Sequence, residues 1–162
     1  MTDAPHVAMT DAPHVMIVES PYYKEIADRM IESVLIELDA VGATYERFEV
    51  PGTFELPGAI RMAIESYKYP SERKRFDGYI ALGCVIRGET SHYDYVCNES
   101  ARGLNDLVLK YSIALGYGVL TTENGDQALA RASRDNHDRG GAAARACLAM
   151  IDLKRKFNLY PR

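Results

Sequence analysis

Four short runs that alternate with helical patterns constrain the fold of this chain most strongly; three are apolar, and the second is less regular, as for a strand at a sheet edge. The runs have strand length and lie at residues 15–18, 45–50, 79–86 and 116–122. Helical patterns follow them at residues 24–41, 57–67, 96–111, 128–131 and 141–157. Strands that alternate with helices predict a parallel sheet with right-handed crossovers and helices on both faces.

Local signals predict where several elements begin and end. Gly42 follows the last apolar residue of the first helix and predicts its end. Pro57 suits the first turn of the second helix, and Asn124 or Asp126 can cap the fourth. The charged stretch from Lys68 to Asp77 predicts a connection on the surface.

Length and composition limit the class of protein. The 162 residues suit one domain with a sizeable core, and a net charge of −4 offers no basic surface for nucleic acid or an anionic membrane. No apolar stretch is long enough to span a bilayer. Cys84, Cys97 and Cys147 form no CxxC pair, which argues against a disulfide framework or a zinc site and favours the cytoplasm.

The first residues contain a duplication. Residues 1–7 recur as residues 9–15, a period too short for a structural repeat. We therefore expect residues 1–13 to be a disordered leader and residues 14–162 to be a single domain. His6 and His14 belong to this duplication and are therefore not considered as metal ligands.

The loop after the third strand run carries the chemistry. Its backbone N–H groups at Gly88, Glu89 and Thr90 precede a helix, where the partial positive charge of the helix dipole favours an anion. Ser91 is expected to cap that helix, with Asp94 three residues later, and His92 beside them can exchange protons near neutral pH. An ordinary strand-to-helix connection uses the same residue types, so these residues alone indicate only a generic phosphate-binding α/β protein.

Three further loops follow strand runs in the same way, at residues 20–23, 52–55 and 123–126. Because ligands of parallel α/β sheets bind beyond the carboxyl ends of the strands, we expect all four loops to meet at one edge of the molecule.

Three sequence blocks together closely resemble the 6,7-dimethyl-8-ribityllumazine synthase family. They are PGTFELP at residues 51–57, GCVIRGETSHYD at 83–94 and TTEN at 121–124, in that order and spacing. The resemblance covers about residues 15–157. It implies a flavodoxin-like three-layer α/β/α sandwich with a four-stranded parallel sheet. It also implies the condensation of 5-amino-6-(D-ribitylamino)uracil with 3,4-dihydroxy-2-butanone 4-phosphate, which releases phosphate and water without a metal or an organic cofactor.

The resemblance assigns roles to particular residues. His92 is implied as the proton carrier. The pyrimidine and its ribityl chain would contact Tyr22, Thr53, Phe54, Glu55, Cys84, Val85, Ile86 and, from a neighbouring subunit, Tyr117. The phosphate would be bound by Glu89, Thr90, Arg131 and Arg139. Many relatives have other residues at four of these positions: Phe or Trp at 22, Thr at 84, Phe at 117 and Lys at 139. Cys84 is expected to be a small buried residue and not a nucleophile.

The resemblance also implies a homopentamer with active sites between adjacent subunits, and some members assemble further, into paired pentamers or a shell. Two alternatives remain open at this stage. One is a catalytically silent protein that binds flavin or lumazine, and the other is a shell-forming scaffold with a vestigial pocket.

Overall fold

A computed structural model describes residues 12–159, and it confirms the predicted alternation of strands and helices. The elements are β1 (His14–Glu19), α1 (Lys24–Ala40), β2 (Thr44–Glu49), the short 3₁₀ helix η1 (Thr53–Glu55), α2 (Leu56–Ser66), β3 (Gly78–Ile86), α3 (His92–Tyr111), β4 (Ala114–Thr122), α4 (Gly125–Ala132) and α5 (Arg139–Lys156).

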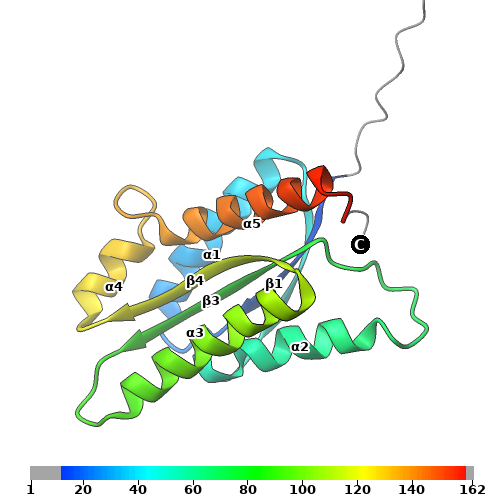
Figure 1. Ribbon diagram of the computed structural model, residues 1–162. Helices are drawn as coiled ribbons and strands as arrows, with labels where there is room; N and C mark the ends of the chain where they lie inside the picture. Colours follow the sequence, from blue (N-terminus) through cyan, green and yellow to red (C-terminus); the bar gives the residue numbers. More distant parts are fainter. Residues whose placement is uncertain (1–11, 160–162) are drawn as a thin grey trace, which may run out of the picture.

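The four strands form one parallel sheet in the order β2-β1-β3-β4. Helices α1, α4 and α5 cover one face and α2 and α3 cover the other, so the molecule has three layers (Figure 1). This is the flavodoxin-like α/β/α sandwich that the sequence predicted. The order leaves β2 and β4 at the two edges of the sheet.

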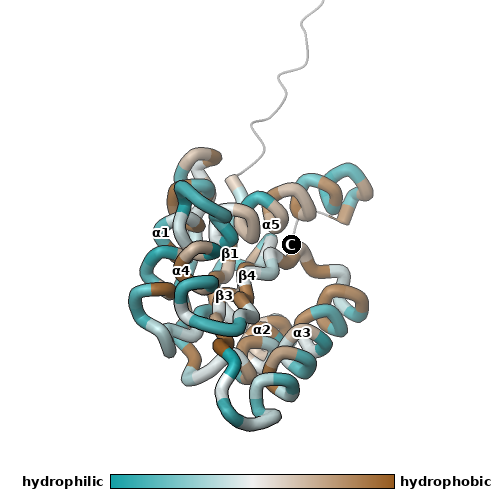
Figure 2. The backbone as a smooth tube through the Cα atoms, turned by 90° about the vertical axis from the view of Figure 1, so that its left-hand side faces the viewer, coloured by the Kyte–Doolittle hydropathy of each residue, from teal (hydrophilic) through white to brown (hydrophobic). Residues whose placement is uncertain are grey.

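The alternation of side chains along the strands divides the core into two parts. Val15 and Ile17 of β1 pack toward α1 and α5, whereas Met16 and Val18 pack toward α2 and α3. All four are at least 97% buried. Figure 2 shows the helices on either side of the sheet, each with hydrophilic and hydrophobic residues interleaved. Burial on both faces explains why the central strands β1 and β3 read as nearly continuous apolar runs.

The ends of several elements follow the predicted signals. Gly42, just past α1, has a φ of +68°, a conformation that glycine adopts without steric cost. Asn124 caps α4 by accepting a hydrogen bond from the backbone N–H of Gln127 at 2.9 Å. Within residues 12–159, no helix combines the length and the apolar character that crossing a membrane requires.

One local prediction was wrong, at the end of the connection between α2 and β3. Phe76 and Asp77 are buried, although the charged stretch predicted a surface connection. Asp77 accepts a 2.7 Å hydrogen bond from the backbone N–H of His14, and the ring of Phe76 stacks on the ring of His14 at 5.1 Å. His14 is thus a buried residue of β1. Residues 1–11 of the predicted leader, including His6, lie outside the described residues.

Candidate active site

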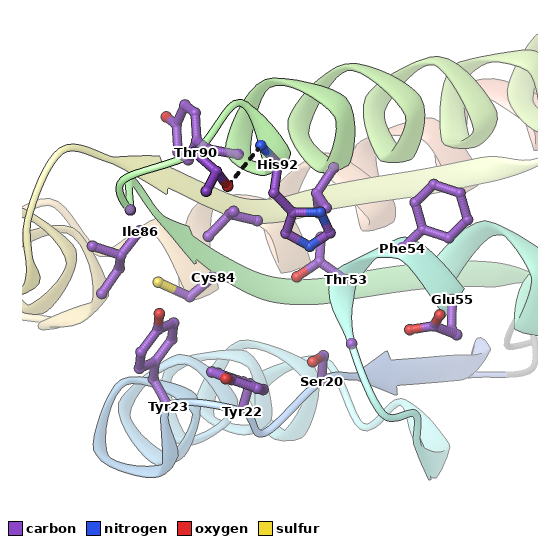
Figure 3. A pocket seen from close by; sticks show the side chains of 15 residues that line it. Ser20, Tyr22, Tyr23, Thr53, Phe54, Glu55, Cys84, Ile86, Thr90 and His92 are labelled. Atoms are coloured by element: carbon purple, nitrogen blue, oxygen red, sulfur yellow. Dashed lines mark hydrogen bonds between the residues drawn. The ribbon is translucent and has the colours of Figure 1, made fainter.

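A cavity of about 540 Å³ lies at the carboxyl ends of β1 and β3, large enough for a small-molecule ligand. It is lined by Ser20, Tyr22, Tyr23, Gly52, Thr53, Phe54, Glu55, Cys84, Val85, Ile86, Gly88, Thr90, His92, Tyr93 and Val96. Three of the four predicted loops therefore meet here, as the parallel topology requires. Figure 3 shows the side chains of the loop after β1 on one side of the cavity and His92 on the other.

The loop after β1 supplies aromatic surface at the mouth of the cavity. Tyr22 is 74% exposed and meets Tyr23 edge to face, with ring centroids 5.0 Å apart. Burial raises the pKa of the Tyr23 phenol, and the nearby Cys84 adds to this, so the hydroxyl stays protonated at neutral pH. The exposed ring of Tyr22 is free to stack on a flat heterocycle.

The loop before α2 is held against the sheet by Thr53, which is 95% buried. A Cβ atom on Gly83 of β3 would lie only 2.6 Å from the Thr53 hydroxyl oxygen, so the absence of a side chain at Gly83 allows this close approach. Thr53 is thereby fixed, while Phe54 and Glu55 remain exposed beside it and line the cavity. A carboxylate in this position can accept hydrogen bonds from hydroxyl groups.

The end of β3 forms the floor of the cavity. Burial raises the pKa of the Cys84 thiol to about 11, so the thiol is protonated at neutral pH. A protonated thiol is a poor nucleophile, which agrees with the predicted structural role of Cys84. Val85 and Ile86 continue the strand into the loop that precedes α3.

His92 is the first residue of α3, and its imidazole points into the cavity toward the loop that carries Thr53 (Figure 3). The expected cap was wrong in detail. Ser91 occupies the N-cap position but makes no side-chain hydrogen bond there, and the hydroxyl of Thr90 accepts one from the backbone N–H of His92 at 3.3 Å. The backbone N–H groups of Gly88, Glu89 and Thr90 donate to no other described residue, which leaves them available to an anion at this helix start.

Four predicted site residues lie outside the lining of the cavity: Glu89, Tyr117, Arg131 and Arg139. Tyr117 is 45% exposed on edge strand β4, and Glu89 lies on the exposed loop before α3. Arg131, half-buried on α4, donates to the carbonyl of Gln127 at 3.2 Å. Within the described residues neither Arg131 nor Arg139 has a carboxylate within 4 Å, so both guanidinium charges are free for an anion.

Sequence reasoning assigned no role to four side chains that line the cavity: Ser20, Tyr23, Tyr93 and Val96. Tyr23 and Tyr93 each stand next to a residue that was predicted, so their loops signalled the neighbourhood but not the side chain. Val96 lies one turn of helix beyond His92, and that helical spacing could have identified it. Among residues 12–159 no cluster of three or more His, Cys, Asp or Glu side chains could hold a metal ion.

Comparison with known proteins adds independent support. The family model described as 6,7-dimethyl-8-ribityllumazine synthase matches residues 12–155. The chain is 51% identical to 6,7-dimethyl-8-ribityllumazine synthase 1 of Rhizobium meliloti, over 83% of this chain and 87% of the relative. It is 48% identical to the corresponding synthase of Agrobacterium fabrum, over 83% of this chain and 90% of the relative. The chain belongs to the 6,7-dimethyl-8-ribityllumazine synthase family.

Proposed function

We infer that this protein is a transferase that condenses 5-amino-6-(D-ribitylamino)uracil with 3,4-dihydroxy-2-butanone 4-phosphate. The products are 6,7-dimethyl-8-ribityllumazine, phosphate and water, and the reaction is the penultimate step of riboflavin biosynthesis. The observation that carries this inference is one cavity that combines an exposed aromatic ring, a carboxylate and a histidine beside free loop amides. Family membership then selects the reaction from those that such a site could serve.

The polar and aromatic residues of the cavity suit the pyrimidine substrate. The ring would stack on Tyr22, because that side chain is exposed and lies at the mouth of the cavity. The end of β3 at Cys84, Val85 and Ile86 would contact the ring from below. The ribityl hydroxyl groups would donate to the carboxylate of Glu55.

His92 would serve as the proton carrier. The amine of the pyrimidine attacks the ketone and water leaves, phosphate is then eliminated, and the second amine closes the ring with loss of a second water. The elimination of phosphate removes a proton from the carbon beside the imine, and the other steps move protons on nitrogen and oxygen. An imidazole within hydrogen-bond reach can carry out such transfers near neutral pH. Much of the acceleration would come from holding the two reactants in a reactive geometry.

The phosphate group would be bound by the free backbone N–H groups before α3 together with positively charged side chains. The N–H groups of Glu89 and Thr90 supply donors. Arg131 and Arg139 supply guanidinium groups that no carboxylate among the described residues neutralises. Both arginines lie outside the cavity of the single chain, as does Tyr117.

A homopentamer would bring such residues to the site from an adjacent subunit. The partly exposed ring of Tyr117 on edge strand β4 supports a contact with a second copy, because a large aromatic side chain at a sheet edge offers apolar surface that a second chain could cover. Further assembly of pentamers would not alter this shared site. The three free cysteines suit a cytoplasmic protein.

Steady-state kinetics of two matched histidine variants test the proposed function. His92→Ala is expected to slow lumazine formation by about ten- to a thousandfold, as for a positioned acid–base group. His137→Ala is the control, since His137 is exposed in the loop before α5, outside the cavity, and should retain wild-type rates. If the wild-type protein binds lumazine or flavin tightly without accelerating the reaction, it is a binding protein. If it forms large particles and binds neither, it is a scaffold.

A further inference from the structure

Arg87 lies beside the phosphate-binding loop, yet its charge is already engaged. Its Nε donates to Glu123 Oε2 at 2.8 Å, and its Nη1 lies 3.5 Å from Asp94 Oδ1. Its guanidinium also stacks on the ring of Tyr93, 4.2 Å from the ring centroid. With two carboxylates around it, Arg87 is poorly suited to bind a phosphate.

The three partners of Arg87 lie at points that define the path of the loop. Arg87 is the first residue after β3, and its backbone N–H donates to the carbonyl of Thr122 at 2.9 Å. Tyr93 and Asp94 are in the first turn of α3, where the loop ends. Glu123 belongs to the next loop, directly after β4. One side chain therefore joins the entrance of the loop, its exit and a neighbouring loop.

Between these ends the loop has little else to hold it. Residues 88–91 are exposed, and a Cβ atom on Gly88 would meet nothing within 4 Å. The 3.3 Å bond between Thr90 and His92 is the one side-chain hydrogen bond within this segment that the described structure contains. The positions of Thr90 and His92, which both line the cavity, then depend on the anchors at the two ends.

The geometry points to Arg87 as a positioning residue that holds the loop of residues 88–91 and His92 in their reactive arrangement through Glu123, Asp94 and Tyr93. This inference rests on the proposed function for its kinetic consequence, but not for its structural one. Exposed ion pairs contribute little to global stability, so losing this one should leave the protein folded. A small displacement of a catalytic group can nevertheless reduce turnover about a hundredfold.

Hydrogen exchange tests the structural part without any substrate. Glu123→Ala removes the strongest partner of Arg87 and leaves the sequence of residues 86–95 unchanged. Amide exchange in a peptide covering those residues should become severalfold faster. Glu99→Ala is the matched control, because it breaks another exposed pair on α3, Glu99 with Arg102 at 2.6 Å, and should leave exchange in that peptide unchanged. Unchanged exchange in Glu123→Ala, or an equal rise in both variants, would overturn the inference.

Kinetics test the functional part. Arg87→Ala should lower kcat by about ten- to a hundredfold and raise KM for the phosphorylated substrate, with KM for the pyrimidine near wild type. Arg87→Lys should recover part of the rate, since lysine keeps the charge but not the planar fork. Wild-type kinetics in Arg87→Ala would refute the positioning role. An inactive wild-type protein with the expected exchange pattern would refute the proposed function alone.

Discussion

The buried carboxylate of Glu19 provides a stability prediction whose size follows from the structure. Glu19 ends β1, and its side chain is 4% exposed. Arg47 on edge strand β2 reaches it with Nε at 2.9 Å and Nη2 at 2.7 Å, a two-point contact to one carboxylate oxygen. Replacing Arg47 with Met keeps the packing of its aliphatic stem but leaves the carboxylate buried without its cation.

Loss of one partner from a fully buried ion pair costs about 3–5 kcal/mol. Arg47 is 43% exposed, so water already screens part of the attraction, and we expect a loss of about 2–3 kcal/mol. For a domain of this size the melting temperature should fall by roughly 5–10 °C. The measurement is thermal and urea unfolding at one fixed protein concentration, because subunit association would otherwise shift the transition.

A double-mutant cycle separates the charge from the shape of the pair. Glu19→Gln alone should cost less than about 1 kcal/mol, since its amide oxygen still accepts from Arg47. Glu19→Gln with Arg47→Met should be more stable than Arg47→Met alone, because no charge remains buried. The reasoning is refuted if the free energy of unfolding of Arg47→Met lies within about 0.5 kcal/mol of the wild-type value. It is also refuted if adding Glu19→Gln to Arg47→Met restores no stability.

Three other perturbations test separate parts of the account. Gly83→Ala would place a Cβ atom 2.6 Å from the Thr53 hydroxyl, so it should lower the free energy of unfolding in urea by about 1–3 kcal/mol. The displaced Thr53 should also raise KM for the pyrimidine, and an unchanged KM would contradict its contribution to that site. Tyr22→Ala should weaken pyrimidine binding by about 1–2 kcal/mol in calorimetry with little change in stability, and equal affinities would exclude stacking. Because burial raises the pKa of Cys84 from 9.0 to about 11, its protonated form stabilises the fold below pH 9, and roughly 2–3 kcal/mol is lost between pH 9 and 11. Cys84→Ala should therefore lose less stability over that window than wild type, and parallel losses would contradict the shift.

Much of the fold could be predicted because short-range patterns determine it. The apolar runs of the central strands are continuous because both faces of the sheet are covered, and the stripe of α1 repeats at three- and four-residue steps. The parallel topology then places the loops after β1, β2 and β3 together whatever their sequence. The edge position of β2 agrees with its irregular pattern, since half of that strand is exposed.

Features that depend on distant residues could not be predicted in this way. Asp77 reads as the end of a charged surface segment, whereas in the fold its carboxylate accepts a hydrogen bond from the backbone of His14, 63 positions away. Thr90 and Ser91 both carry hydroxyl groups, and backbone geometry decides which one accepts from His92. Arg87, Asp94 and Glu123 lie apart in the sequence, so the contact that joins their loops appears only in three dimensions.

The proposed condensation is tested by measuring both of its products in one reaction. Purified protein is mixed with 5-amino-6-(D-ribitylamino)uracil and 3,4-dihydroxy-2-butanone 4-phosphate, and lumazine and phosphate are followed together against heat-denatured protein. We expect both products to appear in equal amounts, well above the control, and the acceleration to be largely lost in His92→Ala. Formation of the two products at the rate of the denatured control would contradict the proposed function.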